Sequence, residues 1–213
     1  MDDPIIISIE GNIGSGKSSF LQFLKEKFTQ KHIYFLQEPV DSWNEIKDDN
    51  NITILENFYK EPKKYAFTFQ MMAFISRLSL LKRVIESKKY KYIITERSLL
   101  TDKNVFCKML YDDGLIEKME YNIYMKWFDE FNIHSQYKTI FMYLKCDTYI
   151  AQQRVDNRNR KGEKISFDYL DKCNQYHNNW LHNMDSNLVT ILDSNRDKTY
   201  YNSLFDEIKN MFI

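Results

Sequence analysis

The stretch that decides the fold reads Gly11-Asn12-Ile13-Gly14-Ser15-Gly16-Lys17-Ser18. It follows the apolar run Ile5–Ile9 and opens a stretch of helical character, Ser18–Phe28. A glycine-rich loop between a strand and a helix, closing in Gly-Lys-Ser, wraps backbone N–H groups around the phosphates of a nucleotide. In such a loop Lys17 reaches the terminal phosphates and Ser18 holds Mg2+. The sequence therefore predicts a binding site for a nucleoside triphosphate.

The composition excludes several classes of protein. The chain has 213 residues, of which 43% are hydrophobic and 28% charged, and its formal net charge is zero. A net charge of zero argues against general binding to polymeric nucleic acid or to a membrane surface, since such binding rests on a basic face. No apolar run approaches the roughly 20 residues that span a bilayer. We therefore expect one domain over residues 1–213, with small-molecule ligands and no nucleic-acid or membrane partner.

The cysteines and the start of the chain bear on location. The first apolar strand begins by Ile5, so we expect no targeting peptide. Cys107, Cys146 and Cys173 are odd in number and include no C-x-x-C pair, so neither disulfides nor a cysteine zinc site is expected. The four histidines show no metal-ligand spacing. These features favour a reducing, cytoplasmic location.

Short apolar runs alternate with stretches of helical periodicity along the chain. The runs predict strands at Ile5–Ile9, Ile33–Leu36, Tyr92–Thr95, Ile140–Leu144 and Leu188–Leu192. The periodic stretches predict helices at Ser18–Phe28, Asn51–Tyr59, Pro62–Ser87, Thr101–Tyr111, Ile116–Asn132, Thr148–Arg160, Phe167–Met184 and Tyr200–Met211. Alternation of this kind predicts an α/β fold, a five-stranded parallel sheet with helices on both faces. Ligands of such sheets bind at the carboxyl ends of the strands.

Two of the predicted strands end in charged residues. Glu38 follows the second strand and is kept extended by Pro39, so its carboxylate can act as a general base on an attacking hydroxyl. An ordinary surface glutamate fits this position equally well. Glu96 and Arg97 follow the third strand. Glu96 is a candidate Mg2+ ligand, and Arg97 is a candidate partner of Glu38 or of the acceptor oxygen. A structural ion pair is the alternative there.

The helix predicted at Pro62–Ser87 presents Phe69, Gln70, Ala73 and Arg77 on one face. Phe69 can stack on a ring, and Gln70 offers a donor and an acceptor side by side, which suits the edge of a nucleobase. Aromatic residues at helical spacing also fit an ordinary hydrophobic core. The face is therefore a candidate binding surface.

Arginine is scarce, with seven residues against twenty-three lysines, and three arginines lie close together at Arg154, Arg158 and Arg160. A chain that uses lysine for general surface charge keeps arginine for planar, bidentate contacts. We predict an arginine-rich lid over about residues 154–165 that neutralises charge on a transferred phosphoryl group. A solvated basic helix end is the alternative.

These features together resemble the deoxynucleoside kinase family, in the branch of deoxycytidine, deoxyguanosine and deoxyadenosine kinases, over nearly the whole chain. The resemblance rests on the phosphate loop, Glu38-Pro39-Val40 with Trp43, Tyr59 with Pro62, Phe67-Thr68-Phe69-Gln70, Ser76-Arg77, Glu96-Arg97-Ser98, the Arg154–Arg160 segment and Tyr169-Leu170. It implies a P-loop kinase fold and a homodimer joined through helices. It also implies transfer of phosphate from ATP or another triphosphate, with Mg2+, to a deoxynucleoside.

The resemblance further implies roles for single residues. Glu38 is expected to deprotonate the sugar 5′-hydroxyl, and Arg97 to hold both that hydroxyl and Glu38. The segment Asp193–Lys198, with Asp197, is expected to pack around the base of the donor. The other acceptor contacts implied are Tyr59 and Glu163 on the 3′-hydroxyl, Gln70 on the base, Phe69 and Phe106 on either side of it, and Trp43 in the pocket wall. Gly162 departs from the pattern, because relatives often carry a second acid there.

Arg77 and Asp102 bear on the choice of base, since an arginine and an aspartate stand at the matching places in the branch named above. A carboxylate accepts from the amino group of cytosine or adenine, whereas thymine presents its O4 acceptor. Two acceptors placed opposite each other without a proton between them cost about 1–3 kcal/mol of binding free energy, roughly ten- to a hundredfold in affinity. Arg77 can steady Asp102 and donate to a purine N7 or O6. We expect deoxyadenosine, deoxycytidine or deoxyguanosine ahead of thymidine, with a lean to purines because Ala73 and Ser98-Leu99 leave room.

Two alternatives stay open at this point. A nucleoside monophosphate kinase of the thymidylate kinase type shares the fold and the loop, but its phosphate acceptor calls for an arginine near the second strand. A catalytically silent, kinase-shaped structural subunit would be free to lose its catalytic residues, and Lys17, Ser18, Glu38, Glu96 and Arg97 are all present. A regulatory GTPase is disfavoured because the chain has no Asn-Lys-x-Asp guanine motif.

Overall fold

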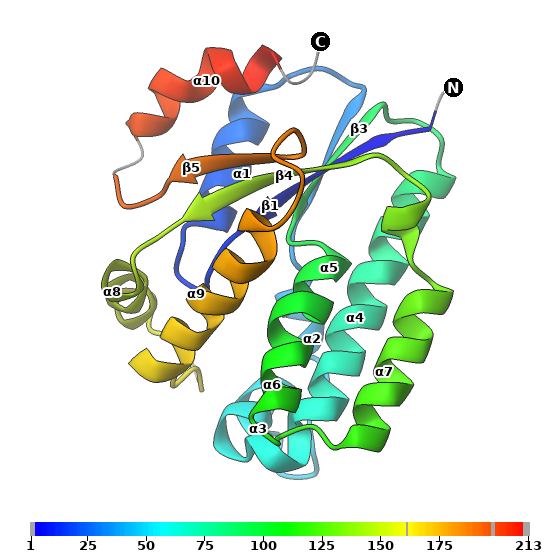
Figure 1. The fold of residues 1–213 in the computed structure, drawn as a ribbon, viewed down its shortest axis with the longest axis vertical. Coiled ribbons are helices and arrows are strands. Elements are labelled where there is room, and N and C mark those ends of the chain that lie inside the picture. Colours follow the sequence, from blue (N-terminus) through cyan, green and yellow to red (C-terminus); the bar gives the residue numbers. More distant parts are fainter. Residues whose placement is uncertain (1–2, 161, 197–198, 211–213) are drawn as a thin grey trace.

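Five apolar segments pair into one parallel sheet in the computed structural model of the chain, which describes residues 3–160, 162–196 and 199–210 (Figure 1). The strands are β1 (Ile5–Glu10), β2 (Ile33–Leu36), β3 (Tyr92–Glu96), β4 (Thr139–Lys145) and β5 (Val189–Asp193). Their spatial order is β2-β3-β1-β4-β5, and all pairings between neighbours are parallel. The five predicted strands are confirmed, each to within one residue at either end.

Both faces of the sheet are covered by helices, as the sequence predicts. The covering helices are α1 (Lys17–Lys27) and α10 (Tyr200–Asn210) on one face, and α4 (Pro62–Glu86) and α9 (Phe167–His182) on the other. Successive side chains of β1 alternate between these faces. Ile7 and Ile9 join the hydrophobic cluster of α1 and α10, whereas Ile6 joins the cluster of α4. The central strand is therefore buried on both sides, which is typical of parallel sheets.

Among the other helices, the predicted ones differ from the prediction mainly in their ends, and the short elements at Val40–Trp43 and Ile133–Ser135 were not predicted. These other helices are α2 (Val40–Trp43), α3 (Ile54–Lys60), α5 (Leu99–Thr101), α6 (Lys108–Asp112), α7 (Lys118–Glu130) and α8 (Thr148–Arg158), with a π-helical segment η1 (Asp102–Cys107) and a 3-10 turn η2 (Ile133–Ser135). The helix α3 begins three residues later than predicted because Thr53 and Glu56 form a capping box. The prediction of one regular α-helix over Thr101–Tyr111 is wrong in one respect, because this stretch contains the π-helical segment η1. A short π-helical segment cannot be recognised from the spacing of apolar residues.

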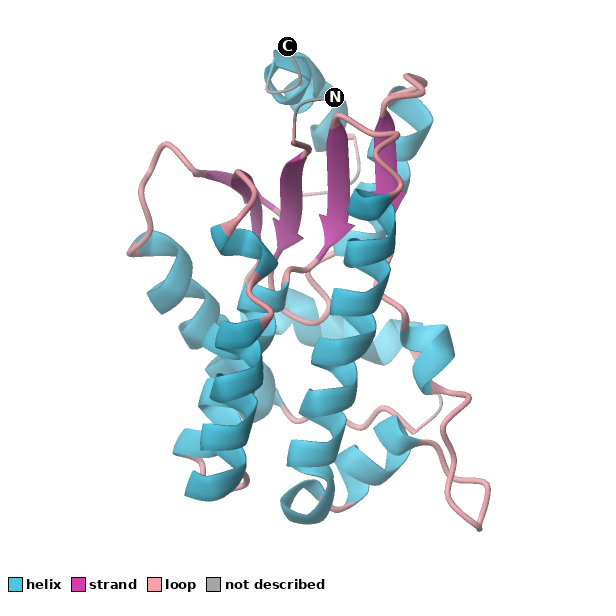
Figure 2. Ribbon diagram, turned by 90° about the vertical axis from the view of Figure 1, so that its right-hand side faces the viewer, coloured by secondary structure: helices cyan, strands magenta, loops and turns pink. Residues whose placement is uncertain are grey.

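The carboxyl ends of the strands point toward the larger group of helices. In Figure 2 the arrowheads face this helical half, and the two termini lie at the opposite end of the molecule. A second hydrophobic cluster, which includes Trp43, Phe58, Phe69 and Phe74, packs these helices together beyond the sheet. Residues at the strand ends thus face this group of packed helices.

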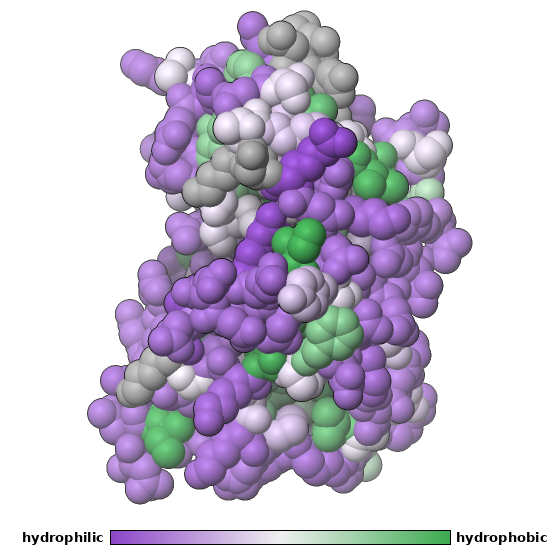
Figure 3. All heavy atoms as spheres, turned by 90° about the vertical axis from the view of Figure 1, so that its left-hand side faces the viewer, coloured by the Kyte–Doolittle hydropathy of each residue, from purple (hydrophilic) through white to green (hydrophobic). Residues whose placement is uncertain are grey.

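The surface is not uniform. The side of the molecule that carries α8 and α10 is mostly hydrophilic, with hydrophobic residues scattered over it (Figure 3). Exposed hydrophobic residues form a row on and next to α7, at Met119, Ile123, Trp127 and Phe131. Ile75 of the neighbouring α4 is also half exposed. Among the described residues, none of the helices has the length and apolar composition that a membrane crossing needs.

Candidate active site

The phosphate loop leaves β1 at Gly11 and enters α1 at Lys17. Two of its glycines are required because a side chain would clash with neighbouring backbone atoms and because their backbone conformation disfavours other residues. A Cβ on Gly14 would lie 2.3 Å from the Ala151 carbonyl oxygen, and one on Gly11 would lie 2.6 Å from that of Leu144. Both residues also have positive φ angles, 80° and 144°. The predicted strand–loop–helix setting of the motif is therefore present.

Part of the loop anchors it to its surroundings and does not line the cavity described below. Asn12 donates from Nδ2 to the Leu170 carbonyl oxygen at 2.9 Å. The Ser194 hydroxyl donates to the carbonyl oxygen of Ser15. Three residues of the loop that were predicted to bind the nucleotide are therefore buried and do not line the cavity: Gly11, Asn12 and Ser15.

The lysine of the loop is buried among charges. Lys17 donates to the Asn12 carbonyl oxygen at 2.7 Å. Burial lowers its pKa to about 7, with a further contribution from Arg97, against the opposing effect of Glu96 and other carboxylates. The adjacent Ser18 hydroxyl donates to Glu96 Oε1 at 2.6 Å. A hydroxyl and a carboxylate oxygen side by side at a phosphate loop form a donor set that fits Mg2+, which takes few protein ligands beside phosphate and water.

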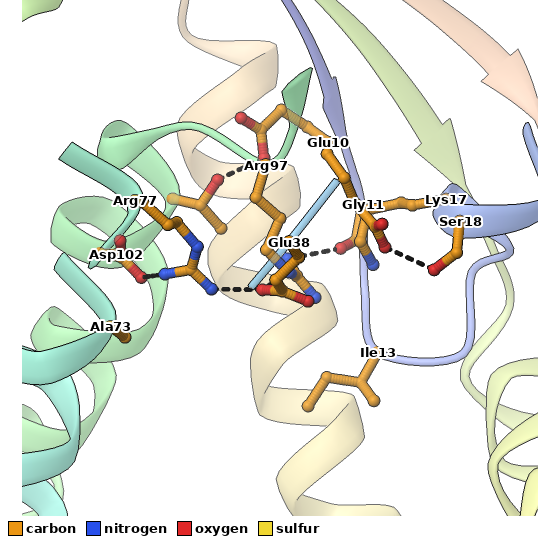
Figure 4. A network of polar contacts seen from close by, with 12 residues as sticks. Glu10, Gly11, Ile13, Lys17, Ser18, Glu38, Ala73, Arg77, Arg97 and Asp102 are labelled. Atoms are coloured by element: carbon orange, nitrogen blue, oxygen red, sulfur yellow. Dashed lines mark hydrogen bonds and ion pairs between the residues drawn. The ribbon is translucent and has the colours of Figure 1, made fainter. Parts of the chain in front are cut away.

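Glu38 lies at the end of β2 and receives two guanidinium groups on the same oxygen. Arg97 Nε is 3.4 Å from Glu38 Oε1, and Arg77 Nη2 donates to that oxygen as well (Figure 4). Burial alone would raise the pKa of Glu38, but the charges of Arg77, Arg97 and Lys17 outweigh it and lower the pKa to about 2. The predicted Arg97–Glu38 contact is present, whereas the Arg77–Glu38 ion pair was not predicted.

Arg97 adopts a left-handed backbone conformation with φ of 67°, directly after β3. Such a conformation is uncommon for a residue with a side chain and is typical of functional sites. Its Nη1 donates to the Gly11 carbonyl oxygen at 2.9 Å, and its guanidinium lies 4.9 Å from the centre of the Phe106 ring. Arg97 therefore connects the phosphate loop, Glu38 and Phe106.

The far end of the site carries polar groups on α4 and η1. Arg77 Nη1 donates to Asp102 Oδ1, which confirms the predicted pairing of these side chains. Burial raises the pKa of Asp102 to about 6 despite the opposing charge of Arg77. Among the described residues, Gln70 Oε1 and Asp102 Oδ2 are buried without a hydrogen-bond partner. Buried polar atoms without partners are costly, so this end is suited to a polar ligand.

Aromatic rings border these groups. Phe69 stacks on Phe58 with ring centres 4.9 Å apart and meets Trp43 edge to face at 5.6 Å. The Trp43 Nε1–H donates to the Ser76 hydroxyl at 2.8 Å, which fixes the indole. Phe69 thus belongs to the hydrophobic core and also lines the cavity. The two interpretations of its helical spacing, a core residue and a binding surface, therefore both hold.

The three clustered arginines all line the same cavity as the phosphate loop. Arg158 Nη2 donates to Glu163 Oε2 at 2.6 Å, and Arg160 Nη1 is 3.8 Å from Glu163 Oε1. Arg154 instead approaches the Cys146 sulfur at 3.6 Å. Gly162 has φ of 74°, and a Cβ there would lie 2.0 Å from Glu56 Cγ, so a second acid does not fit in this arrangement.

One cavity of about 600 Å³ unites the site. The predicted residues that line it are Ile13, Gly14, Gly16, Lys17, Ser18, Glu38, Trp43, Tyr59, Phe69, Gln70, Arg77, Glu96, Arg97, Asp102, Phe106, Arg154, Arg158, Arg160 and Glu163. Asp197 lies outside the described residues. Arg196, from the predicted donor-base segment Asp193–Lys198, also lines the cavity, and unpredicted lining residues include Tyr201 of α10 and Leu55 and Phe58 of α3.

Two buried side chains near the site were missed by the sequence analysis. Glu10 is fully buried and accepts from the Ser8 hydroxyl at 2.7 Å, from Ser98 N–H at 3.0 Å, and from the hydroxyls of Ser98 and Thr101. His177 is fully buried, with Nε2 3.4 Å from Arg97 Nη1. Glu10 could have been noticed as a charged residue that ends an apolar run, a signal that gives no partner, whereas His177 lies in a mostly polar stretch and carries no such signal.

Comparison with known proteins agrees with this geometry. A family model described as deoxynucleoside kinase matches residues 7–213. The probable deoxycytidine kinase of fowlpox virus is 33% identical, over 97% of this chain and 89% of its own length. Human deoxycytidine kinase is 29% identical over 95% and 89%, and mitochondrial deoxyguanosine kinase of Xenopus laevis is 28% identical over 96% and 86%.

The fold and the site define a phosphotransferase of the P-loop kinase fold that uses a nucleoside triphosphate as donor. The chain belongs to the deoxynucleoside kinase family, which confirms the resemblance read from its motifs. The kinase names of its relatives support an enzyme and not a silent structural subunit.

Proposed function

We propose that the protein transfers the γ-phosphoryl group of ATP to the 5′-hydroxyl of a 2′-deoxynucleoside, in nucleotide salvage. The observation that carries this proposal is the position of Glu38, a carboxylate at the end of β2 in the same cavity as Lys17 and Ser18. A phosphate acceptor has little use for a base at this place, whereas a hydroxyl can donate its proton to the carboxylate. This argues against the thymidylate kinase alternative.

In the proposed reaction the 5′-oxygen loses its proton to Glu38 and forms the new bond to the γ-phosphorus. The bond from that phosphorus to the bridging oxygen breaks, and the electron pair leaves with ADP. Lys17 and the loop amides bind phosphate, and Arg154, Arg158 and Arg160 stabilise charge on the transferred group. Arg97 orients Glu38 and the hydroxyl. Ser18 and Glu96 are the residues that would hold Mg2+, which neutralises phosphate charge.

For the acceptor, we propose that Tyr59 and Glu163 bind the 3′-hydroxyl and that Gln70 and Asp102 bind the base between Phe69 and Phe106. The unpaired Asp102 Oδ2 supports a base with an amino group, because an ionised carboxylate only accepts. We therefore propose deoxycytidine, deoxyadenosine or deoxyguanosine ahead of thymidine. The small side chain of Ala73, between Gln70 and Arg77, supports a lean to purines, whereas Ser98 and Leu99 do not line this cavity.

We also propose a homodimer in which two copies of the α4–α7 face meet. The row of exposed hydrophobic residues on α7, with Ile75 of α4, supports this interface, because a two-fold contact pairs one patch with itself.

One experiment tests the reaction. ADP release is measured with ATP, Mg2+ and, in turn, each deoxynucleoside and each deoxynucleoside monophosphate. We expect turnover with deoxycytidine, deoxyadenosine or deoxyguanosine to the 5′-monophosphate, and a kcat/KM for thymidine that is roughly ten- to a hundredfold lower. Turnover of thymidylate alone would support the alternative. Comparable kcat/KM values for thymidine and deoxycytidine would refute the discrimination by Asp102.

A further inference from the structure

One guanidinium group bridges the two functional ends of the acceptor site. Arg77 Nη1 donates to Asp102, at the base end, and Arg77 Nη2 donates to Glu38, the candidate base that follows β2 (Figure 4). All three side chains lie in the same cavity, and the Arg77 and Asp102 side chains are 9% and 1% exposed. Base recognition and proton transfer are therefore joined through a single side chain.

The bridge opposes the chemistry that Glu38 has to perform. An oxygen that already accepts from Arg77 and lies 3.4 Å from Arg97 is stabilised as an anion and is a weak base. A general base works best when its pKa lies near the working pH. The cations beside Glu38 hold its pKa at about 2, far below that range. Loss of one cation would make Glu38 a better proton acceptor.

Arg77 has donors and neighbours that allow another arrangement. Among the described residues, its Nε is buried without a partner, as are Asp102 Oδ2 and Gln70 Oε1 nearby. Its guanidinium lies 5.0 Å from the centre of the Trp43 ring, a flat surface along which it can shift while keeping a cation–π contact. A base with an acceptor atom in this region can therefore take hydrogen bonds from Arg77.

We propose that Arg77 restrains Glu38 in an ion pair until a fitting nucleobase draws the guanidinium toward itself and Asp102, which frees the carboxylate to accept the 5′-proton. This inference rests on the proposed function and adds to it a coupling between the base pocket and the catalytic carboxylate. A base that binds without engaging Arg77 leaves the ion pair intact. Selectivity among bases then appears in kcat as well as in KM, as in induced fit.

The test uses an acceptor without a base. With 1,2-dideoxyribose, which keeps the 5′- and 3′-hydroxyls, nothing draws Arg77 away, and the wild type should be slow. Arg77→Met removes the cation from Glu38 and should raise kcat/KM for this sugar by about tenfold or more, while lowering kcat/KM for deoxycytidine. Labelled γ-phosphate in ATP gives the required sensitivity, and circular dichroism and ATP binding report whether the fold is kept.

Two further variants make the result interpretable. Arg77→Lys keeps a cation beside Asp102 but lacks the planar fork that spans two carboxylates, so it should also gain activity on the bare sugar. Asp102→Asn leaves Arg77 in place and should give no gain. An unchanged or lower rate on the bare sugar in both Arg77 variants would overturn the restraint, and would assign Arg77 to base binding or to positioning. If the wild type phosphorylates no deoxynucleoside at all, the proposed function itself fails, and the restraint fails with it.

Discussion

The hydroxyl of Ser18 donates to Glu96 Oε1 at 2.6 Å, between the first turn of α1 and the last residue of β3. Residues 78 positions apart thus bring two oxygens together at the phosphate loop. The side-chain geometry follows from the parallel pairing of β1 with β3, in which Ile9 and Glu96 are partners. It gives the protein a pair of oxygen ligands suited to a hard cation.

Glu96→Gln should therefore weaken the binding of the Mg2+ that the reaction uses. We expect the Mg2+ concentration for half-maximal rate to rise by about tenfold or more, because a neutral amide replaces a charged ligand. Steady-state rates over a Mg2+ titration measure this. Glu26→Gln, on the exposed side of α1, is the matched control. An unchanged titration in Glu96→Gln would remove Glu96 from the metal site.

Glu38→Gln keeps the shape of the side chain but cannot take a proton. We expect kcat to fall by about 100-fold or more, with little change in ATP affinity, because the donor half of the site is untouched. Single-turnover rates and ATP binding by calorimetry separate the two effects. Glu86→Gln, exposed at the end of α4, should behave as the wild type. Retained kcat in Glu38→Gln would exclude the general-base role.

The sequence predicted those parts of the fold and site that follow from local pattern and from the geometry of parallel sheets. Glu38 and Glu96 were found because each ends an apolar run, and the carboxyl ends of parallel strands share one edge. Lys17 and Ser18 were found from a motif whose spacing is fixed by the phosphate it binds. Such features need no knowledge of how distant elements pack.

Contacts that depend on packing were not predicted. The Arg77–Glu38 ion pair depends on how far α4 lies from the end of β2, which neither segment determines alone. The hydrogen bonds of Glu10 join β1 to the start of α5, and the π-helical turn at Asp102 arises within a run that is otherwise helical. In each case the deciding interaction is between segments, and the sequence of one segment carries no sign of its partner.

Glu10→Ala should destabilise the fold strongly. The substitution leaves the Ser98 N–H and the hydroxyls of Ser8, Ser98 and Thr101 without their buried acceptor. We expect the free energy of unfolding to fall by about 3 kcal/mol or more, since each unpaired buried donor costs roughly 1–3 kcal/mol. Urea denaturation measures this change. Glu86→Ala serves as the exposed control, and equal stability of the two variants would show that the Glu10 hydrogen bonds are weak.

The α4–α7 face should hold the dimer together. Introducing charge with Met119→Asp and Trp127→Asp, which are 75% and 42% exposed, should raise the dissociation constant of the dimer by tenfold or more, or about 1.4 kcal/mol. Light scattering coupled to size exclusion measures the mass over a range of concentrations. Tyr149→Asp, on α8 and 63% exposed, is the matched control. A monomeric wild type, or a dimer unaffected by the α7 substitutions, would contradict the interface.

His134 should make the protein sensitive to acid. Burial lowers its pKa from 6.5 to about 4, and its Nδ1 lies 3.0 Å from the Thr139 hydroxyl. Between these pH values the unfolded chain binds a proton at this residue that the folded chain does not. The contribution of neutral His134 to the free energy of unfolding is therefore fully present above pH 6.5. It is lost as the pH falls from 6.5 to about 4, by about 1.4 kcal/mol per pH unit and about 3 kcal/mol in all.

Chemical denaturation of the wild type and His134→Gln at pH 7.5, 6.0 and 4.5 isolates this contribution from that of the carboxylates, which both proteins share. We expect the difference in unfolding free energy between the two proteins to shift in favour of His134→Gln as the pH falls. A difference that stays constant from pH 7.5 to 4.5 would mean that His134 is protonated equally in the folded and unfolded chains, and that its burial does not oppose its charge.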